Sequence, residues 1–394
     1  MAGSNTLTGL IPVIYDAMDV VSREQVGFIP AVAKNSSAER AALGETITYP
    51  VVPQGTLVDI TPGTTPNFSG GQTIAPASMT ISKSKAYEVL WGGEEQKGAS
   101  NSGQYGEMLK NQFAQGFRTI ANAVEADLAA AALIASSRAY GTAGTTPFAN
   151  AGDMSDFAQT RKILIDNGAP LGDLHMVLNT TAAANIRGKQ STLFKVNEAN
   201  SDALLRQGSI NALPIEGFIM HESGQAGSMS QVKGTGASYT TDASGYAIGS
   251  TTINLIAGSG TVKAGDVLTF AGDPNKYIVA SGIGAPGVVT LAAPGLQQAI
   301  PAAATNATVG NSYTGCFAFD RSAIQLVTRA PAMPLDPSGR AIDSAEDVTE
   351  VVDPVSGLVY QIAMYRLYRS IKFEIGLAWG CKGVKSNHIA TLLG

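Results

Sequence analysis

The sequence predicts an α+β protein in which a small all-β module is inserted into a host of mixed helices and strands. Residues 223–315 hold only six charged side chains, against 51 in the other 301 residues of the chain. Gly, Ala, Ser, Thr, Val and Pro dominate this segment, which contains short β-type runs at 252–256 and 266–270. A long helical period at 104–137 and a period of two at 370–380 predict the helix and the sheet of the host. The six charged residues are Lys233, Asp242, Lys263, Asp266, Asp273 and Lys276.

Composition bounds the class of protein. With 394 residues and 44% hydrophobic content, the chain is long enough for two or three domains with buried cores. The longest unbroken apolar run, residues 128–135, is far short of the ~20 residues that span a bilayer, and the first residues lack a signal-peptide pattern. We therefore expect folding in a cytoplasm. Cys316 and Cys381 lack metal-ligand spacing, which predicts reduced thiols and neither a disulfide nor a zinc site.

The first hundred residues predict two extended features. Residues 8–21 have an apolar stripe at helical spacing, and we expect this amphipathic arm to dock on its own body or on a neighbour. Two β-type runs follow at 45–60 and 72–91, separated by a turn-rich segment at 61–71. Prolines in and around these runs disfavour a central sheet position and favour a projecting hairpin. Because a two-stranded ribbon is marginal in water, this one is predicted to need a partner surface.

A spine helix is predicted at 104–137, where apolar residues step by three and four along one face. At 1.5 Å per residue it would be ~50 Å long, more than most single domains need. The residues of the face are Phe113, Phe117, Ile120, Val124, Leu128 and Ala131.

The following segment predicts a central region of alternating helices and strands. A second helix begins at a cap, Asp153, and ends at Gly168 and Pro170. A strand at 174–178 leads through a second cap, Asn179, into a helix that stops at Gly188. A third helix at 198–207 and a strand at 215–221 lead into the insert. The second helix is predicted to turn inward Met154, Phe157, Ala158, Leu164 and Ile165.

Beyond the insert, strands are predicted at 317–327, 358–368 and 370–380. In the last of these, large apolar residues alternate with small or polar ones, which predicts one buried face. The residues of the buried face are Ile371, Phe373, Ile375, Leu377 and Trp379.

Charge is unevenly distributed along the chain, whose formal net charge is −5. Residues 336–353 carry six acids and one base, and residues 358–394 carry a local excess of four positive charges. Adjacent blocks of opposite sign suit side-by-side packing of identical subunits. The alternative is a solvated acidic loop beside an ordinary strand pair. A calcium site is not supported, since no D-x-D-x-D-G loop is present.

No catalytic, cofactor-binding or metal-ligating residue is predicted. The G-x-G-x-x-G pattern at 282–287 is followed by a strand, so it predicts a turn rather than a pyrophosphate site. Gly188-Lys189 lacks the first glycine and the hydroxyl of a P-loop, and His221-Glu222 lacks the second histidine of a zinc protease. No G-x-S-x-G elbow exists, and the adjacent Glu94 and Glu95 have no pocket context. We expect a protein that is not an enzyme.

Nucleic-acid binding is the other class considered. Basic and aromatic residues mix within 365–385, as on a base-stacking surface. Phe373 and Trp379 nevertheless belong to the predicted buried face, and the pI is near 5.3. Tight binding that is blind to sequence requires a net basic footprint, so core packing is favoured.

The order of these parts resembles the major coat proteins of tailed bacteriophages with the Hong Kong ninety-seven capsid fold. It is most similar to the branch with an inserted β-barrel, typified by the coat protein of phage P-twenty-two. The resemblance covers nearly the whole chain and is carried by the ribbon entry at 47–56, the insert at 260–272, the re-entry at 317–334 and the end at 375–380. The insert is shorter than that of the family example, so contacts attributed to that barrel do not carry over.

The resemblance implies a division of the chain. It gives an N-terminal arm and lead-in at 1–44, an extended β-hairpin loop at 45–98, a spine helix and peripheral domain at 99–150, the first part of a central domain at 151–222, the inserted β-barrel at 223–315, the second part of the central domain at 316–356 and a closing sheet at 357–394.

The implied function is that of a major capsid protein. Copies would form the hexamers and pentamers of an icosahedral virion shell, assembled in the host cytoplasm around double-stranded DNA that they enclose without tight binding. A scaffolding protein and a portal protein are the implied partners, and no membrane or small-molecule substrate is expected. Lys83 and Lys85 on the ribbon are predicted to pair with acids of a neighbour. The alternatives are an encapsulin-like compartment shell and another phage structural protein, such as a tail-tube subunit.

Overall fold

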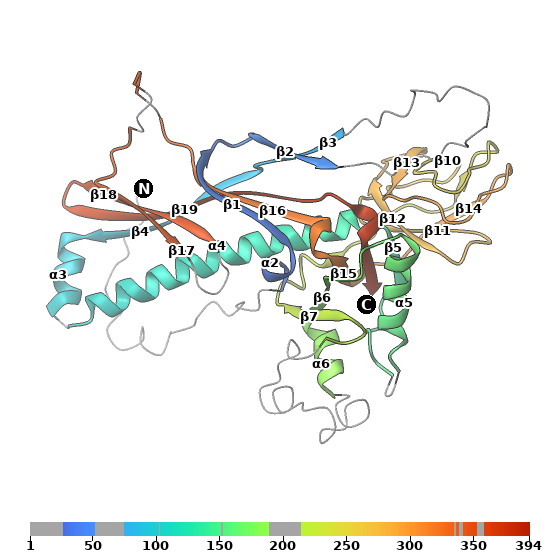
Figure 1. Ribbon diagram of the computed structural model, residues 1–394, viewed down its shortest axis with the longest axis horizontal. Helices are drawn as coiled ribbons and strands as arrows, with labels where there is room; N and C mark the ends of the chain where they lie inside the picture. The colour runs from blue at the N-terminus through green and yellow to red at the C-terminus, as the bar shows by residue number, and fades with distance from the viewer. Residues whose placement is uncertain are drawn as a thin grey trace, which may run out of the picture.

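The computed structural model describes residues 27–51, 75–101, 103–150, 153–188, 214–334, 336–338, 342–352 and 358–394. The predicted arm at 8–21, the ribbon tip at 61–71 and the helix at 198–207 lie outside these residues. The chain is elongated, with a β-barrel at one end and a helix-backed sheet at the other (Figure 1). A central region joins the two and extends below them in this view.

A single long helix forms the spine of the molecule. Helix α4 (Tyr105–Ala135) has 31 residues, which makes it about 46 Å long at 1.5 Å per residue. Ile120, Val124 and Leu128 of the predicted face are buried, so the helical period read from the sequence is confirmed. A shorter helix, α3 (Gly93–Asn101), precedes it and was not predicted.

A six-stranded sheet packs along the spine helix. Its path runs β1 (Ala33–Ala41), β16 (Ile324–Pro331), β19 (Ser370–Gly383), β18 (Val359–Leu367) and β17 (Asp347–Val352), and β4 (Lys83–Gly92) pairs with the other edge of β19. Strand β1 runs parallel to β16, although nearly 300 residues separate them. Two of these strands were not predicted: β1, and β17, which lies in the acidic segment.

Strand β19 corrects one sequence prediction. Ile375, Leu377 and Trp379 are fully buried, as the period of two predicted, whereas Ile371 and Phe373 of the same predicted face are half-buried. The opposite face is buried as well, since Ala378 is inaccessible and a Cβ at Gly380 would lie 2.2 Å from the Thr80 carbonyl oxygen. The root of the ribbon crosses this end of the sheet, so the small residues provide room for it rather than facing water.

The projecting ribbon consists of β2 (Thr46–Val51) and β3 (Ala75–Thr80), paired antiparallel from Thr46 opposite Thr80 to Val51 opposite Ala75. The second predicted ribbon run is divided in the structure. Its first part forms β3, but β4 pairs with β19 over ten residues and belongs to the sheet. The second strand of the ribbon therefore ends at Thr80, and not at residue 91 as predicted.

The central region is built on β5 (Arg138–Gly141), β20 (Ile389–Leu393), β15 (Tyr313–Asp320), β6 (Leu174–Asn179) and β7 (Phe218–Ser223), in that order. Helices α2 (Phe28–Ala31), α5 (Ser155–Asp166) and α6 (Thr180–Gly188) pack on it, and two 3-10 turns lie at Arg321–Ala323 and Ser386–His388.

Of the two predicted caps in this region, Asn179 is confirmed, whereas the N-cap residue of α5 is Met154 and Asp153 lies one residue before it. The Asn179 Oδ1 accepts the Ala182 N–H at 2.8 Å, and the Asp153 Oδ1 accepts the Ser155 N–H at 2.8 Å. The inward face of α5 differs from the prediction, because Ala158 is exposed and Ile165 is 49% exposed. Ile163 is buried in its place, which means that the helix is rotated relative to the assigned stripe.

Strands within residues 239–309 form a closed β-barrel. Strands β9 (Tyr239–Thr241), β10 (Thr252–Ile256), β13 (Gly287–Leu291), β12 (Lys276–Ser281), β11 (Val267–Phe270) and β14 (Asn306–Val309) pair in this order, and β14 pairs again with β9 to close the ring. The barrel has its own core, which includes Leu255, Leu268, Tyr277 and Val289. A short strand, β8 (Ser230–Gln231), and the β12–β5 pairing connect it to the central region.

Among the residues that the structure describes, there is no helix with both the length and the apolar character needed to cross a membrane.

Candidate assembly surfaces

Among the described residues, the β2–β3 ribbon contacts the rest of the chain at its root. Met79 and Ile81 are buried there against Val327 and Ala378, and the Lys382 Nζ donates to the Ser78 carbonyl oxygen at 2.9 Å. Within the described residues the ribbon forms a sheet of two strands, with no third strand on either edge. Apart from the Ser78 carbonyl oxygen, the backbone N–H and C=O groups along both edges have no further strand among the described residues and can pair with another surface.

A buried carboxylate fixes the chain where it reaches the spine helix. Glu125 of α4 is fully buried, and its Oε1 accepts the N–H groups of Gly27 at 2.6 Å and Phe28 at 2.7 Å. Its Oε2 accepts the Ile29 N–H at 3.0 Å, and the Ser223 hydroxyl donates to Oε1 at 2.9 Å. Burial raises the pKa of Glu125, while these four hydrogen bonds act in the opposite direction.

The packing around this anchor is close. The Phe28 ring stacks on Phe319 with the centroids 6.2 Å apart, and Phe28 and Ile29 are fully buried. A Cβ at Gly27 would lie 2.9 Å from the Glu222 backbone and from Val177, so only glycine allows this approach. The position of residues 27–29 is thus set by contacts with α4, β6 and β7. Glu125 gave no signal in the sequence, because a glutamate within a helical pattern is usually on the solvent side.

The predicted partner of Lys83 is wrong. Its Nζ lies 2.6 Å from the Asp127 Oδ1 of the same chain, and the Trp379 indole N–H donates to Asp127 Oδ2 at 2.8 Å. The sequence did not reveal that β4 joins the sheet, which brings Lys83 beside the spine helix. Lys85 on the same strand is exposed, and its pairing with a neighbouring copy stays a prediction.

The acidic and basic blocks meet within one chain. Strand β17 pairs with β18 over six residues, and Glu346 forms an ion pair with Arg366. The Tyr365 hydroxyl donates to Asp343 Oδ2 at 2.7 Å. The acidic segment therefore contributes an edge strand of the sheet rather than a solvated loop, and an acid-to-base contact between subunits stays a prediction.

Two histidines that the sequence analysis treated separately lie together. His175 of β6 and His221 of β7 have Nδ1 and Nε2 atoms 2.9 Å apart, and His175 Nε2 is 2.9 Å from Asp173 Oδ1. Burial lowers the pKa of both rings, that of His221 to about 4. The parallel pairing of β6 with β7 brings them together, which no local motif signals. No group of metal-binding composition occurs among the described residues.

The other motifs considered in the sequence lie at turns, at helix ends or in the core. Residues 282–287 connect β12 to β13, so the predicted turn is confirmed. Gly188 ends α6, and Glu95 at the start of α3 accepts the Gly92 N–H at 2.9 Å. Cys316 and Cys381 are free, and burial raises the pKa of each thiol to about 12. Trp379 is fully buried, which confirms core packing for that aromatic.

Comparison with known proteins gave structural matches alone. No family model matches the chain, and neither does any curated protein sequence. A chain of Mycobacterium phage Che8 is 14% identical, with 89% of this chain and 84% of that chain covered and a TM-score of 0.45. The capsid of cyanophage P-SCSP1u gives 12% identity, 92% and 86% coverage and a TM-score of 0.46. The capsid of a native GTA particle gives 9% identity, with 94% of this chain and 90% of that chain covered and a TM-score of 0.47.

Proposed function

We propose that this chain is the major capsid protein of a tailed bacteriophage, and that copies of it self-assemble into the icosahedral shell around a double-stranded DNA genome. The observation that carries the proposal is the ribbon β2–β3, a two-stranded sheet that projects from the body with both backbone edges unpaired among the described residues (Figure 1). Such a ribbon is marginal by itself, and a neighbouring copy supplies the surface that stabilises it.

The rest of the molecule fits a shell subunit. The spine helix packs on the six-stranded sheet through two hydrophobic clusters that together follow most of its length, which favours a rigid body. Rigid bodies joined by extended pieces tile a curved surface, because each weak contact is repeated over many copies. The function is structural, and the buried histidines and free cysteines of the chain have core positions that need no catalytic role.

The finer assignments extend the same proposal. The fold is of the Hong Kong ninety-seven type, in the branch with an inserted barrel typified by phage P-twenty-two. The arm and lead-in at 1–44 and the hairpin loop at 45–98 belong to this fold, and the barrel at 223–315 is the part that distinguishes the branch. Hexamers and pentamers, a scaffolding protein, a portal protein and assembly in the host cytoplasm belong to this assignment. The acidic chain, with its pI near 5.3, favours enclosing DNA without gripping it.

The test is electron microscopy of the purified full-length chain after assembly, with the nucleic-acid content of the particles measured after nuclease treatment. Closed shells containing DNA when produced with the phage's own packaging components support the capsid assignment. Closed shells that enclose a cargo enzyme indicate an encapsulin-like compartment instead. Rings or filaments indicate a tail-tube protein, and a persistent monomer contradicts every one of these functions.

A further inference from the structure

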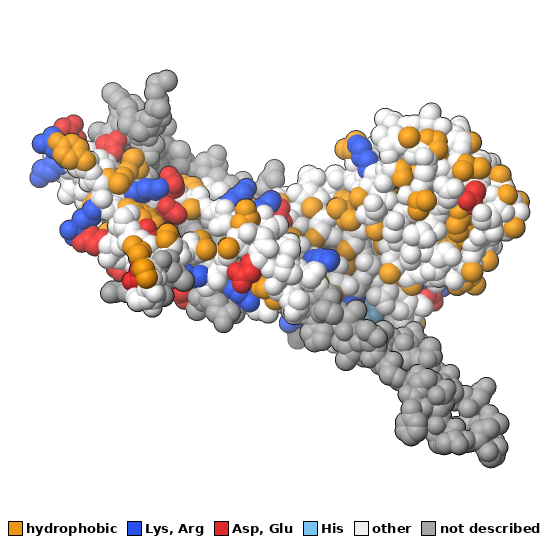
Figure 2. Space-filling model, turned by 90° about the horizontal axis from the view of Figure 1, so that it is seen from above, with side chains coloured by type: hydrophobic (Ala, Val, Ile, Leu, Met, Phe, Trp, Pro, Cys, Tyr) orange, Lys and Arg blue, Asp and Glu red, His pale blue; other side chains and the backbone are white. Residues whose placement is uncertain are grey.

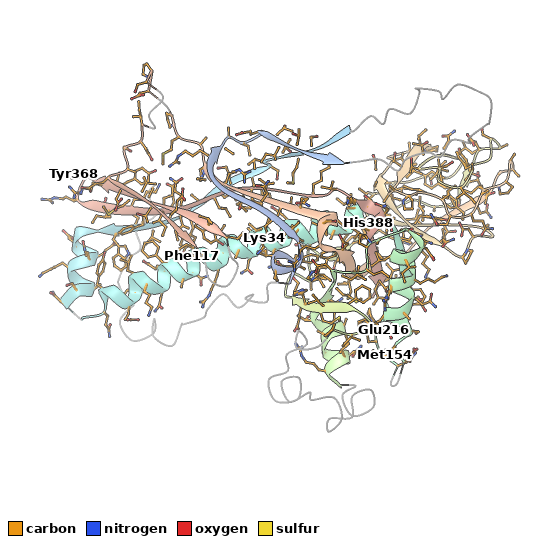
Figure 3. The ribbon with its side chains drawn as sticks, viewed as in Figure 1. Lys34, Phe117, Met154, Glu216, Tyr368 and His388 are labelled. Atoms are coloured by element: carbon orange, nitrogen blue, oxygen red, sulfur yellow. The ribbon has the colours of Figure 1, made fainter. Side chains whose placement is uncertain are left out.

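The end of the molecule opposite the barrel carries an unusual hairpin turn. Strands β18 and β19 are joined by Tyr368 and Arg369, and Leu367 opposite Ser370 is their last pair. Tyr368 is 89% exposed and Leu367 is 50% exposed. The labelled Tyr368 points away from the body (Figure 3), and Figure 2 shows hydrophobic side chains at this end with positive and negative side chains beside them. An aromatic side chain this exposed has no packing role in its own chain.

The backbone of the turn is held in a costly conformation. Arg369 has a φ of 53°, in the left-handed region where glycine or asparagine is favoured. Its carbonyl oxygen accepts the Gly93 N–H at 2.9 Å, which ties the turn to the start of α3. The side chain of Arg369 lies over the Tyr368 ring, 5.8 Å from the centroid. A glycine would relieve the strain, so the presence of arginine indicates a use for its side chain.

A depression lies beside the turn. It has a volume of about 860 Å³ and is formed between the hairpin on one side and the junction of β4 with α3 on the other. Carboxylates and guanidinium groups both line it. The charged and polar lining residues are Glu94, Glu95, Gln96, Arg366, Arg369 and Ser370.

The charges of the depression are partly unused. Arg366 pairs with Glu346, and Glu95 accepts the Gly92 N–H. Within the described part of the chain, Glu94 and Arg369 take part in no ion pair. One tip thus presents the exposed Tyr368 ring beside a depression whose lining includes both Arg369 and Glu94, two charged residues outside the ion pairs of the described chain. A second copy of the same tip has the complementary features.

We propose that Tyr368 of one copy inserts into the depression of the next copy, with Arg369 of the first beside Glu94 of the second. This inference rests on the proposed shell function and names one contact of the shell. The incoming ring lies against the guanidinium groups of the depression, and its hydroxyl reaches a carboxylate. The Tyr368 ring and the depression lie beside each other on one tip but are different surfaces, so each copy inserts its ring into one neighbour and receives the ring of another, in a head-to-tail contact.

The test uses two single-cysteine variants, Tyr368→Cys and Gln96→Cys, mixed before assembly and then oxidised mildly. The expected result is a disulfide-linked dimer in the mixture and none in either variant alone. Background from Cys316 is suppressed because that thiol is buried, and Cys381 is half-buried with a raised pKa. The wild-type chain under the same oxidant is the control.

The outcomes separate this inference from the shell function. Closed shells without the dimer overturn the contact and leave the shell intact as a proposal. A dimer in Tyr368→Cys alone means that tips meet face to face, which overturns the head-to-tail arrangement. A chain that stays monomeric overturns both the contact and the shell function.

Charge reversal supplies a second measurement that does not need cysteines. Arg369→Glu and Glu94→Arg should each slow assembly about tenfold, and the double variant should recover most of the wild-type rate. Lys97→Glu is the matched control, because Lys97 is exposed on α3 but does not line the depression. Its assembly rate should equal that of the wild type. Equal rates for all variants, with melting temperatures unchanged, contradict the proposal.

Discussion

Removal of the Glu125 carboxylate should release residues 27–32 from the spine helix. In Glu125→Ala, the three N–H groups and the Ser223 hydroxyl lose their acceptor. Each buried donor left without an acceptor costs about 1 to 3 kcal/mol. Keeping the segment in its buried position with four such donors therefore costs more free energy than detaching it. Detachment exposes Phe28 and Ile29, which are fully buried, at about 1.5 to 3 kcal/mol each. The predicted loss is therefore roughly 3 to 6 kcal/mol.

The assay is native-state amide exchange of Gly27, Phe28 and Ile29. A loss of about 3 kcal/mol corresponds to a hundredfold faster exchange by opening, which is well within reach of the method. Glu125→Gln keeps one accepting oxygen and should lose about 1 to 3 kcal/mol, because its amide N–H₂ faces a backbone donor. Ser223→Ala is the matched control, since it removes one donor and leaves all three backbone bonds, at about 0.5 to 1.5 kcal/mol. Exchange of Glu125→Ala within threefold of the wild type would refute the reasoning.

Four further predictions concern other parts of the chain. His221, with its pKa lowered to about 4 in the fold, binds a proton more readily when unfolded, so stability should fall between pH 6.5 and pH 4 by on the order of 3 kcal/mol; His221→Asn should reduce this dependence in denaturation curves. A double-mutant cycle of Lys83→Ala with Asp127→Ala should give an interaction energy of roughly 1 kcal/mol between the two side chains, and an interaction energy of zero would contradict this. Lys85→Glu should leave the free energy of unfolding unchanged but slow assembly, and a normal assembly rate would contradict that. Residues 223–315 expressed alone should give dispersed amide NMR signals, because the barrel has its own core and local contacts; a collapsed spectrum would contradict this.

The sequence predicts best where a repeat is local. The spacing from Phe113 to Leu128 predicted the spine helix within two residues at each end, and Asn179 and Gly188 marked the ends of α6. The scarcity of charge in 223–315 indicated a small all-β module, because short strands with uncharged side chains are stable when they pack against one another. These signals depend on neighbours in the sequence.

What the sequence could not predict depends on partners far along the chain. Strand β1 has no apolar alternation, and it is a strand because it pairs with β16. The acidic character of the segment around residues 347–352 suggested a loop, but these residues form a strand because their backbone pairs with β18. The meeting of His175 with His221, and that of Glu125 with Gly27, arises from the packing of segments 46 and 98 residues apart. No pattern within one segment reports such pairs.

Exchange of the ribbon's own amides, at 46–51 and 75–80, tests the central claim most directly. The experiment compares the assembled particle with the dissociated subunit in the same buffer. If neighbouring copies cover the ribbon, edge amides that exchange freely in the subunit should be slowed by at least a hundredfold in the particle. Equal exchange in the two states, or full protection already in an isolated monomer, would contradict the claim that this ribbon finds its stabilising surface on another copy.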